Sequence, residues 1–436
     1  MVGWIGANWF NLVTWVVFAF LSGVSLLILV VATDRGQSLR PGVDRLLRRL
    51  SGRTDLRWLD WEPVVVAIGI AFAAVSAYGI LSGQYGCHPP GVSDPIGEWA
   101  SGRAFWAGTN PFTVSDCGGT IQVPYGLAAV LIDALGSLGG LAGVYVVWGL
   151  VALSLIPLTW ALGGRDRRLV LLVVATSPLY VPLITSQIDG ATNAIVPATV
   201  LLALYLARRS ELLGAMVGGF LSTARFPNLF PVLAGTGSNR RRYLAFAVAA
   251  ATFGAVTAIS YVAWRSDFLD PVFLNQIGRR SFSLNFYGVL LFQNALPSST
   301  WVEGLEAGAT LVVVLAAFFL VRSPVRAVAI TLVAFTLITP FLSFNILVWL
   351  LPVALAGTRA RWWLWGVGVV GSLDYNLALN VWAWDDGITW PSEVLDIVVT
   401  ALLVGLFVEL WRAERRGEPT DGPALPTSSA RGAAES

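Results

Sequence analysis

Long apolar runs dominate the chain, and polar residues gather in the segments between them. About 20 apolar residues in a helix can cross the roughly 30 Å hydrocarbon core of a bilayer. Runs of this kind lie at residues 10–32, 62–83, 140–162, 168–185, 190–206, 243–264, 302–321, 326–343, 362–380 and 392–411. Shorter or interrupted runs lie at 124–137, 211–235 and 344–357. The pattern predicts an all-α polytopic membrane protein with about 11 to 13 transmembrane helices.

The positions of the arginines predict which loops face the cytoplasm. The segment between the first two runs contains Arg35, Arg40, Arg45, Arg48, Arg49, Arg53 and Arg57. Positively charged loops stay on the cytoplasmic side of a membrane. We therefore expect the N-terminus and the loops at 84–123 and 265–301 on the outer face, and the C-terminal tail in the cytoplasm.

Two of the short apolar segments do not fit a simple crossing. An odd number of crossings must join residue 123, on the predicted outer face, to residue 165, on the predicted cytoplasmic face. Because residues 140–162 make that crossing, the segment 124–137 is expected to lie at the outer interface or to re-enter the membrane. The segment 211–235 has arginine-rich ends on one side but is too short to cross twice at about 1.5 Å per residue. It predicts a re-entrant or thin helical hairpin with its bend near Arg225-Phe226-Pro227-Asn228, because proline disfavours helix at and before its position.

Composition agrees with a membrane location and divides the chain into three parts. The sequence is 56% hydrophobic and 12% charged, and its net charge of +2 gives no reason to expect nucleic-acid binding. The first run has no cleavage signature of a signal peptide, so residues 1–61 are expected to form a retained helix with an arginine-rich loop. Residues 62–412 form the main membrane domain, and residues 413–436 are expected to be disordered.

The outer loop at 84–123 concentrates the groups that carry chemistry. It contains both cysteines of the chain and its single histidine, His88. A disulfide between Cys87 and Cys117 is favoured because the loop faces an oxidising compartment. Two free thiols, or a metal site with His88 and Asp94, are the alternatives, although adjacent cysteine and histidine are poor tetrahedral ligands.

The same loop predicts a short helix that starts near Asp94. Asp94 is a plausible N-cap, Pro95 suits the first helical position, and Glu98 follows one turn later on the same face. A capped surface helix without catalytic function is the simpler alternative. The helix also carries aromatic residues expected to anchor it at the membrane interface, namely Trp99, Phe105 and Trp106.

A family resemblance starts in this loop and runs from about residue 64 to residue 360. Asp94 precedes Gly97-Glu98-Trp99-Ala100 and then Gly108-x-Asn110-Pro111-Phe112. This string resembles the first outer loop of GT-C fold glycosyltransferases, especially glycosyltransferase family 87, in which an aromatic residue stands at the place of Gly97 and a Tyr-Pro-Pro element at that of Pro124-Tyr125. Two later strings resemble further family motifs, Ser186-Gln187-Ile188-Asp189-Gly190 and Ser222-Thr223-Ala224-Arg225-Phe226-Pro227, the second with arginine in place of lysine.

The resemblance implies transfer of a sugar, mannose or arabinofuranose, from a polyprenyl-phosphate donor to a lipid- or glycan-linked acceptor on the outer face of the cell membrane. It implies Asp94 as general base with Glu98 as helper, and Arg225 as the group that binds the donor phosphate, with Arg279 and Arg280 as second candidates. Alternatives are helix capping for Asp94 and headgroup contacts for the arginines. Candidate contacts to sugar or acceptor are Gln187, Asp189, Asn110, Asp374 and Tyr375.

No cofactor is expected, and the outer loops contain no Asp-x-Asp motif, which favours a metal-independent reaction. The expected partners are the lipid-linked donor, the acceptor and membrane lipids. A transporter or flippase of a lipid-linked sugar is the main rival interpretation, because an intramembrane Asp374 and Arg225 would also suit an ion or phosphate pathway. A scaffold protein would leave the motifs around Asp94, Gln187 and Arg225 without explanation.

Overall fold

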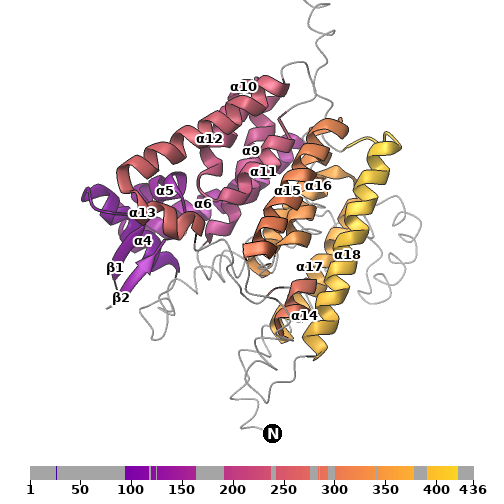
Figure 1. The fold of residues 1–436 in the computed structure, drawn as a ribbon. Helices are drawn as coiled ribbons and strands as arrows, with labels where there is room; N and C mark the ends of the chain where they lie inside the picture. The colour runs from indigo at the N-terminus through magenta and orange to yellow at the C-terminus, as the bar shows by residue number, and fades with distance from the viewer. Residues whose placement is uncertain are drawn as a thin grey trace, which may run out of the picture.

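A computed structural model gives the fold of the chain (Figure 1). It describes Leu26 and residues 94–116, 119–123, 125–163, 191–236, 242–274, 283, 285–292, 300–339, 342, 344–377 and 390–420. The described part is predominantly helical, as the apolar pattern predicted.

The described residues from 94 to 137 form a helix, a two-stranded hairpin and a second helix, of which the first helix and the hairpin lie in the loop predicted at 84–123. These elements are α4 (Asp94–Trp106), β1 (Thr113–Asp116), β2 (Gly119–Gln122) and α5 (Leu127–Ser137). The strands pair antiparallel, with Thr113 opposite Gln122. The helix at Asp94 is confirmed, and the short hairpin is an element that the prediction did not include. Pairing of the two strands satisfies backbone N–H and C=O groups that an irregular loop would leave open.

The remaining elements form a helical bundle. Its first half consists of α6 (Gly140–Leu162), η2 (Ala191–Ala194), α9 (Ile195–Ala207), α10 (Glu211–Ser222), η3 (Phe226–Asn228), α11 (Leu229–Ala234) and α12 (Arg242–Trp264). Its second half consists of α13 (Ser266–Leu269), a π-helical turn η4 (Asp270–Leu274), α14 (Phe286–Phe292), α15 (Thr300–Leu320), α16 (Pro324–Ile338), the 3-10 helix η5 (Phe344–Ala356), α17 (Thr358–Leu377) and α18 (Trp390–Arg415). Helix α18 continues beyond the domain boundary predicted at residue 412.

Among the described helices, α6, α12 and α18 are long and apolar enough to cross a membrane. They coincide closely with three of the predicted spans. Large apolar side chains on their outer faces are exposed, including Leu150 at 60% and Val262 at 76%. Such surfaces require a lipid environment rather than water. The total of 11 to 13 spans stays a prediction, as do the topology and the expected parts 1–61, 62–412 and 413–436.

The segment predicted as a hairpin consists of two short helices joined at a bend. Helix α10 ends at Ser222, and Arg225 has an extended backbone with φ −142° before η3 and α11 begin. The position of the bend is therefore confirmed. Whether the hairpin re-enters the membrane stays a prediction.

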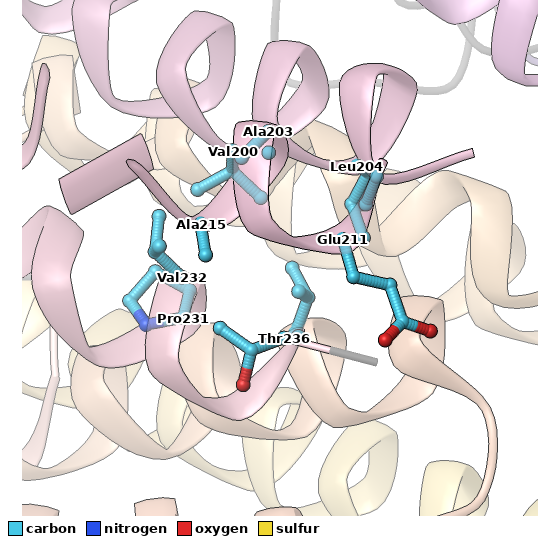
Figure 2. A pocket seen from close by; sticks show the side chains of 12 residues that line it. Val200, Ala203, Leu204, Glu211, Ala215, Pro231, Val232 and Thr236 are labelled. Atoms are coloured by element: carbon cyan, nitrogen blue, oxygen red, sulfur yellow. The ribbon is translucent and has the colours of Figure 1, made fainter. Parts of the chain in front are cut away.

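Packing behind the bend is tight. A cavity of about 10 Å³ lies between α9, α10, α11 and α16. Figure 2 shows its lining, which includes Glu211 among mostly apolar side chains. This volume is close to that of a single water-sized probe, so the cavity is far too small for a sugar. The cavity is therefore not the functional site, and the helices that support the bend form a close-packed base.

Arg208 joins the ends of α6 and α9 that are predicted to face the cytoplasm. Its guanidinium follows α9 and donates hydrogen bonds to the carbonyls of Ala161 at 2.6 Å and Leu162 at 2.5 Å, which lie at the end of α6. Partial burial lowers the pKa of the Arg208 guanidinium, and Tyr205 opposes that shift. A positive charge at a helix C-terminus is favourable because it faces the negative end of the helix dipole.

Candidate functional site

Arg225 lies at the bend between α10 and η3 and is half-buried. Its Nη2 donates a hydrogen bond to the hydroxyl of Tyr125 at 3.0 Å. Its Cζ lies 4.7 Å from the centre of the Tyr125 ring and 5.7 Å from that of Trp349 in η5. Two aromatic rings therefore fix the position of the guanidinium without neutralising its charge.

Tyr125 reaches Arg225 because the chain after β2 packs directly on the bend. The N–H of Gly126 donates to the carbonyl of Ala224 at 3.2 Å, and the N–H of Ala128 donates to Oγ1 of Thr223 at 3.3 Å. A Cβ on Gly126 would overlap the carbonyl oxygen of Thr223. Only glycine permits this approach of the two backbones.

The charge of Arg225 has no acidic partner within the described residues. Its Nε is buried and, among those residues, makes no hydrogen bond. A guanidinium presents five N–H donors in a planar fork, and a phosphate or carboxylate can accept two of them at once. The arrangement around Arg225 is therefore suited to an anion.

Further polar side chains surround this position. Thr192 in η2 is buried and donates to the hydroxyl of Tyr125 at 3.2 Å. Asn193 Oδ1, both amide atoms of Asn228, and Nε1 of Trp349 are buried and lack a hydrogen bond among the described residues. Because buried polar groups are usually hydrogen-bonded, this concentration of polar atoms favours a polar ligand near the bend.

A cluster of aromatic rings connects the bend to both loops that are predicted to face outward. Phe226 beside Arg225 contacts Phe273 at 5.6 Å between ring centres, and Phe273 contacts Phe268 at 5.7 Å. Phe268 in turn contacts Phe112 at 5.0 Å. Phe268 and Phe273 belong to the loop after α12, and Phe112 belongs to the loop after α4. The bend and the two predicted outer loops therefore meet at one end of the molecule.

Helix α4 contains both residues with predicted catalytic roles, Asp94 and Glu98. Asp94 is the first residue of the helix, and its side chain lies outside the described residues. Glu98 is buried, with 2% of its surface exposed. Close packing of α4 on α5 explains this burial, since a Cβ on Gly102 would overlap the backbone carbonyl of Asp133. Burial suits Glu98 as a helper better than as a group that meets an acceptor directly.

Comparison with known protein families decides the identity of the chain. The model of glycosyltransferase family 87 matches residues 120–343, just over half of the sequence. The chain belongs to glycosyltransferase family 87. The matched range contains Tyr125, Thr192, Arg225 and Asn228, and it begins after α4. No curated protein and no solved structure matches the chain.

This family 87 protein is therefore a membrane glycosyltransferase, with a sugar donor and an acceptor as substrates. Several of its predicted site residues lie outside the described part of the structure, namely Cys87, Cys117, Gln187, Asp189, Arg279 and Arg280. The disulfide and the roles of these residues stay predictions. Tyr375 lies in α17, and its side chain is likewise outside the described residues.

Asp374 of the glycosyltransferase is fully buried between α17 and α18. The hydroxyl of Ser392 donates to its Oδ1 at 2.5 Å, and the buried carboxyl of Asp396 lies in the same helix as Ser392. The hydroxyl of Ser392 is the type of hydrogen-bond donor that a buried carboxylate requires. Among the described residues, Asp374 is hydrogen-bonded to Ser392 and not to Arg225 or α4, and its predicted contact with sugar stays a prediction.

Asn110 shapes the turn that follows α4. Its Oδ1 accepts a hydrogen bond from the N–H of Phe112 at 2.9 Å, and Gly108 before it has φ +69°. The Gly108-x-Asn110-Pro111-Phe112 string therefore has a structural role in this glycosyltransferase. Among the described residues, the amide nitrogen of Asn110 makes no hydrogen bond, so it can donate to a ligand.

Sequence reasoning missed the roles of Tyr125, Thr192 and Trp349 beside Arg225. Tyr125 carried a weak signal, because it stands at the place of a family motif in the Pro124-Tyr125 element. Trp349 lies inside an apolar run with no polar neighbour that would single it out. Asp133 in α5 was not singled out either, although a carboxylate within the apolar segment 124–137 is unusual. It is fully buried, and its Oδ1 accepts a hydrogen bond from Nε1 of Trp148 in α6 at 2.8 Å.

Proposed function

We propose that this family 87 glycosyltransferase moves mannose or arabinofuranose from a polyprenyl-phosphate donor to a lipid- or glycan-linked acceptor on the outer face of the cell membrane. Asp94 removes the proton from the acceptor hydroxyl, and Arg225 binds the phosphate that leaves with the lipid. The observation that carries the proposal is the half-buried guanidinium of Arg225, held by Tyr125 and Trp349 without an acidic partner among the described residues.

The charge of the leaving group supports the role of Arg225. When the bond between sugar and phosphate breaks, negative charge collects on the phosphate, and a preorganised cation stabilises that charge most where water is excluded. Arg225 already donates one hydrogen bond to Tyr125 and keeps its other donors for a ligand. The surrounding aromatic rings and buried polar groups hold it in place before the donor arrives.

The location of Arg225 supports action on the outer face. Arg208 and Arg209 precede α10 at its predicted cytoplasmic end, and α10 with the following turn places Arg225 about 20 Å away. Arg225 there contacts the segment after β2, and the adjacent Phe226 contacts the loop after α12. Arg225 is thereby separated from the predicted cytoplasmic side and lies beside the two loops that are predicted to face outward.

The role of Asp94 rests on its helix. A general base must meet the acceptor hydroxyl, and a carboxylate at the start of α4 is held on a rigid element packed on α5. The buried Glu98 lies one turn further along the helix and has the role of helper to Asp94. The reaction needs no metal in this scheme, because Arg225 supplies the positive charge.

A transfer assay with defined donors tests the proposal. Full-length protein in nanodiscs would be mixed with membranes that contain the acceptor and with a radiolabelled sugar donor. The sugar is mannose or arabinofuranose, and it is linked either to polyprenyl phosphate or to a nucleotide. We expect transfer from a polyprenyl-phosphate donor and none from the nucleotide sugar. We expect Arg225→Gln to raise the donor KM about ten- to hundredfold, the scale of a lost charged hydrogen bond.

Arg242→Gln is the matched control. Arg242 is also half-buried, and it also stacks on a tyrosine, with its Cζ 5.0 Å from the ring of Tyr243, but it begins α12 at the predicted cytoplasmic side. Its variant should keep the donor KM of the wild type. Transfer from the nucleotide sugar alone, or an equal effect of both substitutions, would contradict the proposal.

A further inference from the structure

A pocket of about 620 Å³ lies on the outer-loop unit, between the second half of α4, the turn after it, β1 and the end of α5. This volume is in the range of pockets that hold small organic ligands. The side chains in its lining that bear on ligand chemistry are Arg103, Trp106, Thr109, Asn110, Thr113 and Ser137. One aromatic ring and five polar groups therefore share one pocket.

Trp106 has an exposed ring in a fixed orientation. It is 58% exposed, yet its indole N–H donates to the carbonyl of Ala134 in α5 at 2.7 Å. Phe105 contacts the ring edge-to-face at 5.7 Å. A tryptophan that anchors a protein at a membrane interface usually turns its N–H toward water or headgroups. Here the N–H is used inside the protein, so the surface that the side chain exposes is apolar carbon.

The polar groups around this face can both donate and accept hydrogen bonds. Arg103 is exposed, stacks over Trp99 at 4.8 Å, and has no acidic partner among the described residues. Asn110 uses its Oδ1 in the turn and keeps its amide N–H groups. Thr109 donates to the carbonyl of Ala104 at 3.1 Å and keeps its oxygen as an acceptor.

This combination matches the chemistry of a saccharide. A sugar ring has an apolar C–H face that packs on an aromatic ring, and its hydroxyls both donate and accept hydrogen bonds. We propose that the pocket binds a saccharide unit of the acceptor, with Trp106 as the platform and Arg103 and Asn110 as hydrogen-bonding groups. The inference rests on the proposed function, in which the acceptor carries a glycan.

The distance from the proposed base defines which sugar binds here. Arg103 lies nine residues after Asp94 on one helix, about 14 Å along its axis. A sugar in the pocket is therefore not the one whose hydroxyl reacts at Asp94. The acceptor is accordingly longer than one sugar unit, and the pocket holds a unit away from its growing end.

Saturation-transfer-difference NMR tests this binding without a donor and without catalysis. Full-length protein in nanodiscs would be mixed with three soluble probes, the linear trisaccharides of mannose, arabinofuranose and glucose. We expect saturation transfer to at least one probe in the wild type and about a tenfold weaker affinity in Trp106→Ala. Arg103→Gln, which loses the stack on Trp99 but keeps a hydrogen-bonding side chain at this exposed position, should also weaken binding of the same probe.

Trp390→Ala is the matched control, because Trp390 is 65% exposed at the start of α18. It should bind the probe as the wild type does. The proposal is overturned if no probe binds, if Trp106→Ala and Arg103→Gln both bind like the wild type, or if Trp390→Ala weakens binding equally, as a general effect on membrane anchoring would.

The outcome is separable from that of the proposed function. Loss of transfer in Asp94→Asn together with normal probe binding by Trp106→Ala would overturn the saccharide pocket alone. Selective loss of probe binding in Trp106→Ala together with undiminished transfer by Asp94→Asn would overturn the catalytic proposal alone.

Discussion

The hydroxyl of Tyr125 lies 3.0 Å from Nη2 of Arg225, although the two residues are 100 positions apart in the chain. Tyr125 follows the strand hairpin β1–β2, and Arg225 lies at the bend between α10 and η3. Thr192 in η2 donates to the same hydroxyl at 3.2 Å. Three separate parts of the chain therefore cooperate to position one guanidinium.

Removal of the Tyr125 hydroxyl should weaken donor binding more than folding. Tyr125→Phe keeps the ring beside Arg225 but loses the hydrogen bond, which is worth about 1.5–3 kcal/mol when one partner is charged. We expect the donor KM to rise about tenfold or more, with the acceptor KM and the melting temperature little changed. Equal increases in both KM values would show that Tyr125 acts on the fold of the site as a whole.

A side chain at Gly126 should push the segment after β2 away from the bend at Arg225. A Cβ there meets the carbonyl of Thr223, and neither backbone can move without breaking the contacts of Tyr125 and Ala128. Gly126→Ala should therefore lower stability by about 1–3 kcal/mol, the usual cost of overpacking, and reduce transfer. Thermal unfolding in detergent measures the first effect.

Gly149→Ala controls for the substitution itself. Gly149 lies in α6, and a Cβ there meets nothing within 4 Å. Alanine in place of a helical glycine should leave stability equal or raise it by about 0.5–1 kcal/mol. A Gly126→Ala variant as stable as Gly149→Ala would contradict the close contact between Gly126 and Thr223.

The sequence was most informative where one local signal decides the structure. The spans at 140–162, 243–264 and 392–411 correspond to α6, α12 and α18, because a long apolar run in a bilayer has to satisfy its backbone as a helix. The bend near Arg225 followed from Pro227, which disfavours helix before it. Both predictions depend on neighbouring residues alone.

Features that depend on contacts between distant segments were not predictable in this way. The pairing of β1 with β2 joins two four-residue strands whose local pattern is too short to stand out. The packing of Tyr125 and Trp349 around Arg225 depends on how three segments meet in space. Asp374 was recognised as needing a partner, but Ser392 could be identified only from the packing of α17 on α18.

An ion pair between α16 and α18 should stabilise the predicted cytoplasmic side. Arg326 is 2% exposed, and its Nη1 lies 3.1 Å from Oε2 of Glu414. Glu414→Gln would leave the guanidinium buried without its countercharge, so we expect stability to fall by about 3–5 kcal/mol. The melting temperature in detergent measures this loss.

Glu418→Gln is the control for that pair. The side chain of Glu418 contacts the exposed Arg416 at 2.7 Å, and only its backbone carbonyl accepts from Arg326. Exposed ion pairs contribute about 0–1 kcal/mol, so this variant should unfold close to the wild type. Equal melting temperatures for Glu414→Gln and Glu418→Gln would mean that the pair with Arg326 does not hold α16 and α18 together.

The rate of sugar transfer by Asp94→Asn tests whether Asp94 is the general base. The substitution keeps the size of the side chain and removes its ability to accept a proton, and Asp116→Asn removes another carboxylate from the same loop. With radiolabelled polyprenyl-phosphate donor at saturation, we expect Asp94→Asn to transfer about 10²–10⁴-fold more slowly than the wild type. Asp116→Asn should transfer at the rate of the wild type. Undiminished transfer by Asp94→Asn would contradict the account.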